Sequence, residues 1–138
     1  MSLRVAAAVA AAGIVGAAIR WTVATQVDDN WALLIVNVMG CGIVGWATAR
    51  HERTRHRAPV RRGIDSTGRS IAAPSPGLTA GFCGALTSMS ALALQLARYL
   101  DDGRIATAAA WLGLTAAACT AAFVMSRLAV VLSYGRRP

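Results

Sequence analysis

The residues best suited to chemistry form one short run, Gly81–Ser90, which reads Gly-Phe-Cys-Gly-Ala-Leu-Thr-Ser-Met-Ser. Its two glycines and three hydroxyls interrupt an apolar segment of membrane-spanning length. Backbone at membrane depth must satisfy its own hydrogen bonds unless it is buried in protein or lines a cavity. Carbonyls and half-helix ends that such a break releases can coordinate ions. Together with Asn37, an amide inside a second apolar segment, the run predicts a small membrane protein that moves an ion.

Other kinds of chemistry find no support in the sequence. It contains no nucleophile–base set, metal-ligand cluster or phosphate-binding loop, so the chain is not predicted to be an enzyme. Cys41, Cys83 and Cys119 each stand inside an apolar segment without a C-x-x-C neighbour, and we interpret them as small packing residues. The formal net charge of +8 comes from arginines concentrated in loops of a lipid-soluble chain, so it does not indicate nucleic-acid binding.

Four apolar stretches must position these residues. Of the 138 residues, 56% are hydrophobic and 14% charged, which is too apolar for a soluble domain of this size. The stretches cover residues 5–25, 31–48, 77–96 and 105–132, and each approaches the ~20 residues that cross a bilayer. The sequence therefore predicts an all-α membrane protein, a single domain of four transmembrane helices with the third broken in mid-span. Small residues in Gly40–Gly45 predict a close-packed helix face.

The arginines predict the orientation of this bundle. One side collects the chain termini and the 50–76 loop, with Arg4, Arg50, Arg53, Arg55, Arg57, Arg61, Arg62, Arg69, Arg136 and Arg137. The other side holds Arg20, Arg98 and Arg104, offset by Asp28, Asp29, Asp101 and Asp102. Because cytoplasmic loops collect basic residues, we expect both termini and the 50–76 loop in the cytoplasm. Such a basic loop is also expected to contact anionic membrane lipids.

Four motifs, in this order, resemble the Fluc/CrcB fluoride channel family. They are Gly16–Trp21 (Gly-Ala-Ala-Ile-Arg-Trp), Trp31–Gly40 (ending Val-Asn-Val-Met-Gly), Gly81–Ser90, and Ala106–Gly113 (Ala-Thr-Ala-Ala-Ala-Trp-Leu-Gly). Each motif is weak alone, but their order and spacing in a four-span chain are specific. The resemblance covers nearly the whole chain except the 50–76 loop.

The resemblance implies an antiparallel dimer with two pores and a structural sodium ion at its centre. Backbone carbonyls from the third-helix break of both subunits would hold the sodium, and they map to Gly84 and Thr87. Oxygen ligands suit such a hard cation. Fluoride holds its water tightly, so its pathway must replace that shell with hydrogen-bond donors. The expected donors are Asn37, Ser88, Ser90 and Thr115.

Each of these donors also has a structural interpretation, and several other pore positions differ from the family. Asn37 could serve instead as an interhelical hydrogen bond, worth roughly 1 kcal/mol in membranes, and hydroxyls can bond their own helix backbone. Met89 and Leu92 occupy the places of two family Phe rings on the fluoride pathway, whose positive edges can face an anion. The remaining differences are Gln95 for a usual Glu, Trp111 for a usual Tyr and Cys119 for a usual Ser.

Two functions stay open. In the first, the chain is a subunit of a fluoride-selective channel in a bacterial plasma membrane, through which the membrane potential drives fluoride out and gives fluoride resistance. In the second, it is a non-conducting structural partner that completes the dimer and the sodium site. One-sided arginines and the loss of both Phe rings favour a heterodimer with a homologous antiparallel subunit over a homodimer. A small multidrug-type exchanger is a distant alternative, because the first stretch lacks the carboxylate that such carriers need.

Overall fold

The computed structural model describes residues 3–57 and 77–135, and those residues are helical apart from short turns. The elements are α1 (Leu3–Gln26), α2 (Asp29–Arg57), the π-helical segment η1 (Gly77–Cys83), α3 (Gly84–Leu86), α4 (Met89–Asp101) and α5 (Ile105–Gly135). No strand occurs within the described residues. The all-α fold class expected from the sequence is therefore confirmed.

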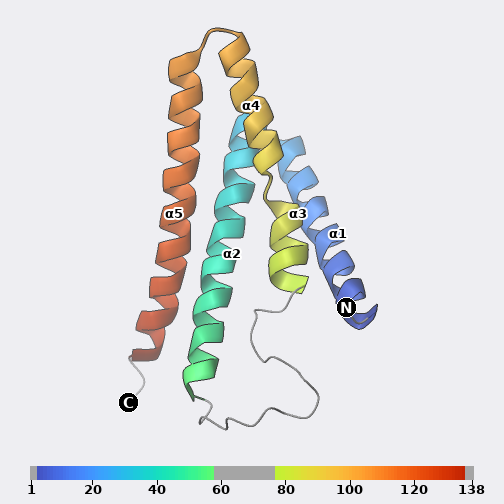
Figure 1. Cartoon of the computed structure of the whole chain (residues 1–138), viewed down its shortest axis with the longest axis vertical. Helices are drawn as coiled ribbons and strands as arrows, with labels where there is room; N and C mark the ends of the chain where they lie inside the picture. The colour runs from blue at the N-terminus through green and yellow to red at the C-terminus, as the bar shows by residue number, and fades with distance from the viewer. Residues whose placement is uncertain (1–2, 58–76, 136–138) are drawn as a thin grey trace.

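Three of the helices, α1, α2 and α5, are long and apolar enough to cross a membrane. The 24 residues of α1 span about 36 Å, more than the hydrocarbon core of a bilayer. Residues 77–101 also run along the bundle, but they form η1, α3 and α4 in succession and not one helix. The third apolar stretch of the sequence is thus a segmented column beside three continuous helices (Figure 1).

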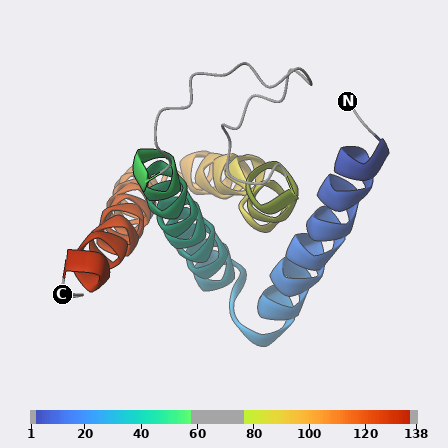
Figure 2. The ribbon, with the colours of Figure 1, turned by 90° about the horizontal axis from the view of Figure 1, so that it is seen from below.

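The helices alternate in direction, so both described chain ends lie at one end of the bundle (Figure 1). η1 and α3 pack against α1, α2 runs alongside α5, and α4 packs mainly against α5 (Figures 1 and 2). At the opposite end, Gly103 takes a left-handed conformation (φ 72°) that turns the chain from α4 into α5. The Arg104 N–H donates to the Tyr99 carbonyl at 2.7 Å and closes that turn.

Glycines allow the closest helix contacts. A Cβ atom on Gly16 would lie 2.5 Å from the Phe82 carbonyl oxygen, and one on Gly81 would lie 2.5 Å from the Val9 carbonyl oxygen. These two glycines therefore let the backbones of α1 and η1 touch. Between α2 and α5, a Cβ on Gly45 would lie 2.5 Å from the Phe123 carbonyl oxygen.

The small residues predicted to form one packing face of α2 in fact point to different neighbours. Gly40 lies against the Thr87 side chain, whereas Gly45 faces α5. Gly42 has no atom within 4 Å of the position that a Cβ would take. Each helical residue advances about 100° round the axis, so Gly42 and Gly45 lie about 160° and about 140° from Gly40, and the three glycines cannot share one narrow stripe.

Three helices extend past their predicted C-terminal ends by three residues or more. α2 continues to Arg57, into what the sequence predicted as the start of the 50–76 loop, α4 continues to Asp101, and α5 continues to Gly135. Arg50 lies over the Trp46 ring at 4.6 Å, and Arg53 donates to the Val131 carbonyl of α5 at 3.0 Å. These contacts let basic residues prolong the helix beyond its apolar part. The rest of that loop, including Arg61, Arg62 and Arg69, lies outside the described residues.

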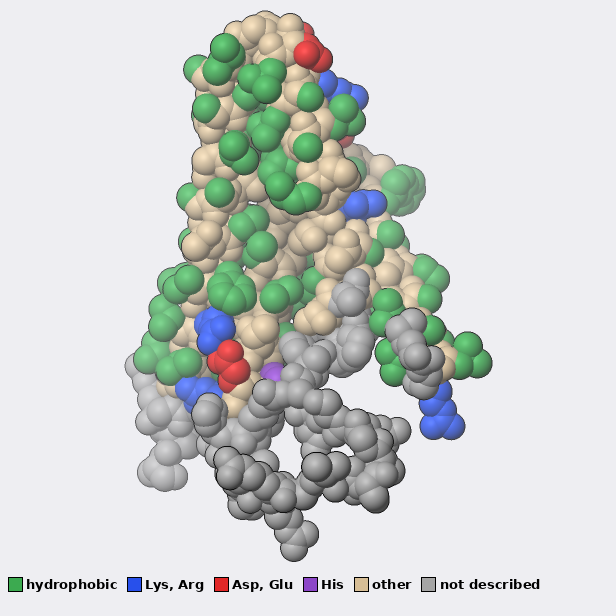
Figure 3. All heavy atoms as spheres, viewed as in Figure 1, with side chains coloured by type: hydrophobic (Ala, Val, Ile, Leu, Met, Phe, Trp, Pro, Cys, Tyr) green, Lys and Arg blue, Asp and Glu red, His purple; other side chains and the backbone are tan. Residues whose placement is uncertain are grey.

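Charged side chains gather toward the ends of the bundle. In the space-filling view of Figure 3, apolar side chains and backbone occupy most of the middle of the face shown. At the end that carries the chain termini, Arg127 pairs with Glu52 at 2.7 Å, with both side chains partly exposed. This distribution suits helices whose centres lie in hydrocarbon and whose ends reach water.

Candidate functional site

The third helical column is interrupted between Leu86 and Met89. Thr87 (φ −81°, ψ 151°) and Ser88 (φ −145°, ψ 100°) are extended, so α3 ends and α4 begins on either side of them. The Thr87 N–H and hydroxyl both donate to the Cys83 carbonyl at 2.9 Å, which closes the end of α3. Within the polar run Gly81–Ser90 that the sequence singled out, the helix is therefore interrupted at two residues, Thr87 and Ser88.

At this break, side-chain oxygens accept hydrogen bonds from backbone N–H groups. The Ser88 N–H donates to Asn37 Oδ1 at 2.9 Å in a buried hydrogen bond, and the Ala91 N–H donates to Ser88 Oγ at 3.2 Å. In a continuous helix these two N–H groups would bond to the carbonyls of Gly84 and Thr87. Serine is a preferred N-cap, which explains why α4 starts here.

Asn37 joins α2 to the break from a buried position, with 6% of its surface exposed. Its Oδ1 accepts the Ser88 N–H, and this bond fixes which way the amide points. Among the described residues the Asn37 side chain makes no other hydrogen bond, so both N–H donors of Nδ2 remain available. The sequence analysis considered an interhelical hydrogen bond as one role for Asn37. That bond exists, but it uses only the amide oxygen.

Ser88 and Ser90 lie together beside Asn37. Their hydroxyl oxygens are 3.3 Å apart, with Ser88 buried and Ser90 exposed. The structure thus brings three of the four predicted donors, from two different helical columns, into one cluster.

Thr115 lies at about the same height on α5. It is separated from Asn37 by the same 78 residues that separate the contacting pair Arg53 and Val131. Thr115 is buried, and within the described chain its hydroxyl does not bond back to its own helix. The Thr48 and Thr120 hydroxyls do so, at 2.9 and 2.8 Å.

The other residues that the sequence analysis named differ in their exposure and contacts. Met89 is 74% exposed whereas Leu92 is 4% exposed, so the two residues that replace the family's Phe rings lie in different surroundings in this subunit. Gly84 is exposed, with no atom within 4 Å of the position that a Cβ would take. Trp111 packs edge-on against Trp31, with ring centroids 5.2 Å apart.

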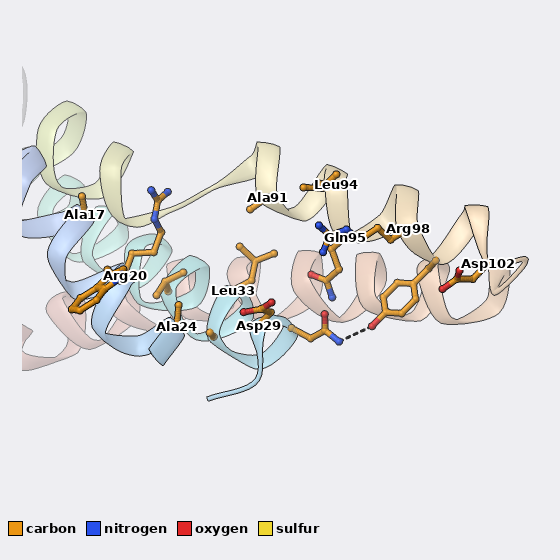
Figure 4. Close-up of a pocket in the computed structure, with 15 residues that line it drawn as sticks. Ala17, Arg20, Ala24, Asp29, Leu33, Ala91, Leu94, Gln95, Arg98 and Asp102 are labelled. Atoms are coloured by element: carbon orange, nitrogen blue, oxygen red, sulfur yellow. Dashed lines mark hydrogen bonds between the residues drawn. The ribbon is translucent and has the colours of Figure 1, made fainter. Parts of the chain in front are cut away.

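The structure also contains a groove that the sequence did not reveal. It has a volume of about 580 Å³ between α1, α2 and α4, and Leu33, Ala91 and Leu94 are among the residues that line it (Figure 4). The four predicted donors do not line it, although Val36 and Ala91, which precede or follow two of them in the chain, do. Arg20, Gln95 and Arg98 also line it. The i, i+3 spacing of Gln95 and Arg98 on a helix was the one sequence signal that could have paired two of them.

Known proteins resemble most of this chain. The family model described as CrcB-like protein, Camphor Resistance (CrcB), matches residues 7–127. The "Fluoride-specific ion channel FluC" of Stutzerimonas stutzeri (strain A1501) is 33% identical over 116 residues, covering 80% of this chain and 83% of the relative. The protein of the same name from Pseudomonas fluorescens (strain SBW25) is 35% identical over 115 residues, covering 76% and 79%.

A third relative, "Fluoride-specific ion channel FluC 1" of Yersinia pestis, is 31% identical over 102 residues, covering 70% of each chain. These matches confirm the resemblance carried by the four motifs. They also agree with the three long apolar helices of the fold. The chain is therefore a multi-pass membrane protein that belongs to the CrcB family, a family of ion channels and not of enzymes.

Proposed function

We propose that this chain is a subunit of a fluoride-selective channel that exports fluoride passively across a bacterial plasma membrane. The observation that carries the proposal is the bond from the Ser88 N–H to Asn37 Oδ1, which leaves the Asn37 Nδ2 donors free beside two hydroxyls. The names of the relatives support fluoride as the ion. The match to channels gives no support to a multidrug-type exchanger.

Donors rather than cations suit a fluoride pathway. Fluoride loses a tightly held water shell on entry, and fixed N–H and O–H groups replace it without trapping the ion as a full charge would. The Asn37 amide, the paired hydroxyls of Ser88 and Ser90, and the Thr115 hydroxyl supply such groups along one level of the bundle. Met89 and Leu92 complete the proposed pathway as apolar wall.

We infer that a sodium ion binds at the break, held by the carbonyls of Gly84 and Thr87. Support comes from the diversion of their helical donors to Asn37 and Ser88, which leaves both oxygens able to face a hard cation. Two subunits would contribute four such oxygens. If the ion is structural, melting temperature in detergent should fall when sodium is replaced by N-methylglucamine; an unchanged melting temperature would contradict this site.

We further propose that the channel is an antiparallel heterodimer, with both termini of this chain in the cytoplasm. Arg4, Arg50 and Arg53 lie at the end of the bundle that carries the chain termini. That one-sided charge should insert every copy in one direction, so the antiparallel mate must be a homologous chain with its basic residues on the opposite side. A mate with intact Phe rings would also supply the groups that Met89 and Leu92 lack.

The alternative function is a structural partner that holds the mate in place while its own pore is silent. The specific observation that favours it is the burial of Leu92 and the exposure of Met89, neither of which offers a donor or a ring edge. In this alternative, variants of this chain's pathway residues would leave fluoride flux unchanged.

A growth test separates these proposals. A bacterium that lacks its own fluoride exporter should gain little fluoride resistance from this chain alone and full resistance when the chain is expressed with its mate. Full rescue by the lone chain would reject the heterodimer. If the mate alone rescues growth as well as the pair, the chain has no part in conduction or assembly.

A further inference from the structure

Cys41 and Cys119 face each other across the contact between α2 and α5. These two helices run side by side in the same direction (Figure 1). The cysteines are 78 residues apart, the same separation as Gly45 and Phe123, whose backbones meet about one turn further along both helices. The Cys41 side chain correspondingly lies against the Cys119 side chain, and neither residue forms a disulfide. Helix packing therefore pairs two thiols that lie far apart in the sequence.

Two thiols without a further ligand select one class of metal ion. Among the described residues, no group of three or more histidine, cysteine or acidic side chains is placed to hold one ion. Cys83 lies close enough to Cys41 to interact with it electrostatically, but it does not complete such a group. Zinc takes four ligands and hard cations take oxygen. Thiolates alone select a soft cation, and one that is content with two sulfur ligands.

Depth in the membrane selects the charge of that cation. Cys41 lies about 18 Å from the start of α2 and Cys119 about 21 Å from the start of α5, so both lie well inside apolar spans. An uncompensated charge at such a depth is costly. Two thiolates around a monovalent ion leave one negative charge, whereas a divalent ion neutralises both.

We propose that Cys41 and Cys119 form a two-thiolate site for a soft divalent cation of the mercuric type, Hg²⁺. On binding, both S–H bonds break and release their protons, and two S–Hg bonds form. The neutral pair of thiols thus becomes a neutral bridged complex. Mercuric chloride has no net charge, so it reaches this depth through the lipid. Both cysteines are half-buried in this subunit and not fully enclosed.

The position of the pair gives the bound metal an effect on conduction. Asn37 precedes Cys41 by one helical turn, and Thr115 precedes Cys119 by one helical turn. The metal therefore lies about 5 Å along the bundle from the level of these two donors, and it ties α2 to α5 there. Under the proposed function, this bridge blocks the fluoride pathway. That effect rests on the proposed function, whereas the metal site does not.

Metal retention tests the site in the full chain, purified in detergent and treated with mercuric chloride. The intact mass of the chain should show one Hg²⁺ gained and two protons lost. This metal should survive a wash with a monothiol at a concentration that strips Cys41→Ser and Cys119→Ser. Cys83→Ser is the matched control and should keep the metal. A wild-type chain that is stripped as easily as the two single variants would overturn the site.

X-ray absorption at the mercury edge tests the site without any variant. The wild-type chain should show two sulfur neighbours around the metal, and a single sulfur neighbour would overturn the bridge.

Fluoride efflux from liposomes that contain the complete channel tests the block. Efflux should stop when mercuric chloride is added and return when a dithiol removes the metal, and Cys41→Ser should continue to release fluoride in its presence. Equal inhibition of Cys41→Ser, or efflux that persists with the metal bound, would reject the block by this pair. If the channel releases no fluoride before the metal is added, the channel proposal fails, and the retention measurement still decides the metal site.

Discussion

At Asn37 the two ends of one amide differ in their hydrogen bonding. The oxygen accepts the Ser88 N–H and fixes the start of α4, while the nitrogen keeps two donors that face away from that bond. The sequence indicated the residue but left a choice between an interhelical bond and an ion contact. The structure shows that the first does not exclude the second, because each uses a different atom.

Asn37→Asp tests this division. The carboxylate can still accept the Ser88 N–H, so the break should persist and the protein should assemble. It replaces both donors with negative charge where an anion must pass, so fluoride efflux through that pore should fall by at least about a hundredfold. Thr25→Asp, which adds the same charge at the exposed end of α1, serves as the control. Unchanged efflux in Asn37→Asp would reduce Asn37 to a structural residue or place it in a silent pore.

At the scale of elements, the apolar stretches predicted the helices well but not their ends or the exact break. Hydrophobic length identifies a span, whereas α2 and α4 are prolonged by residues such as Arg50 and Arg98, whose long side chains suit either a helix or a loop. The break was visible as glycine and hydroxyl content. Its position at Thr87 and Ser88 combines a local cap, Ser88 Oγ on the Ala91 N–H, with a bond from Asn37 of a different helix, and local sequence does not encode the second.

Close contact between α1 and η1 depends on Gly16. Gly16→Ala would place a methyl group 2.5 Å from the Phe82 carbonyl oxygen, so the backbones must separate, at a cost of about 1–3 kcal/mol. Gly42→Ala is the matched control, because no atom lies within 4 Å of the added carbon. Thermal unfolding in detergent should show a clearly lowered melting temperature for Gly16→Ala alone. Equal melting temperatures for the two variants would mean that these helices do not pack so closely in the membrane.

At the scale of the whole molecule, the topology brings both described chain ends to one side and the groove toward the other. The distribution of arginine and aspartate along the sequence already predicted these two sides. The groove itself could not be predicted, because it forms from residues of α1, α2 and α4 whose distances depend on how the helices pack.

From this asymmetry we predict that every copy of the chain inserts in one orientation. In a background without Cys41, Cys83 and Cys119, a membrane-impermeant maleimide should label Thr25→Cys in intact cells. It should label Ser133→Cys only after the membrane is opened, since Ser133 lies near the other end of the bundle. Comparable labelling of both positions in intact cells would show that copies insert both ways, and it would remove the main reason for a heterodimer.

Fluoride efflux from liposomes that contain this chain and its mate, followed with a fluoride electrode and repeated with chloride, tests the channel function most directly. We predict rapid fluoride release, no measurable chloride release, and loss of the share of fluoride flux that passes Asn37 when that residue is changed to aspartate. Equal release of both anions, or fluoride release that the change leaves untouched, would contradict a selective pathway through this subunit.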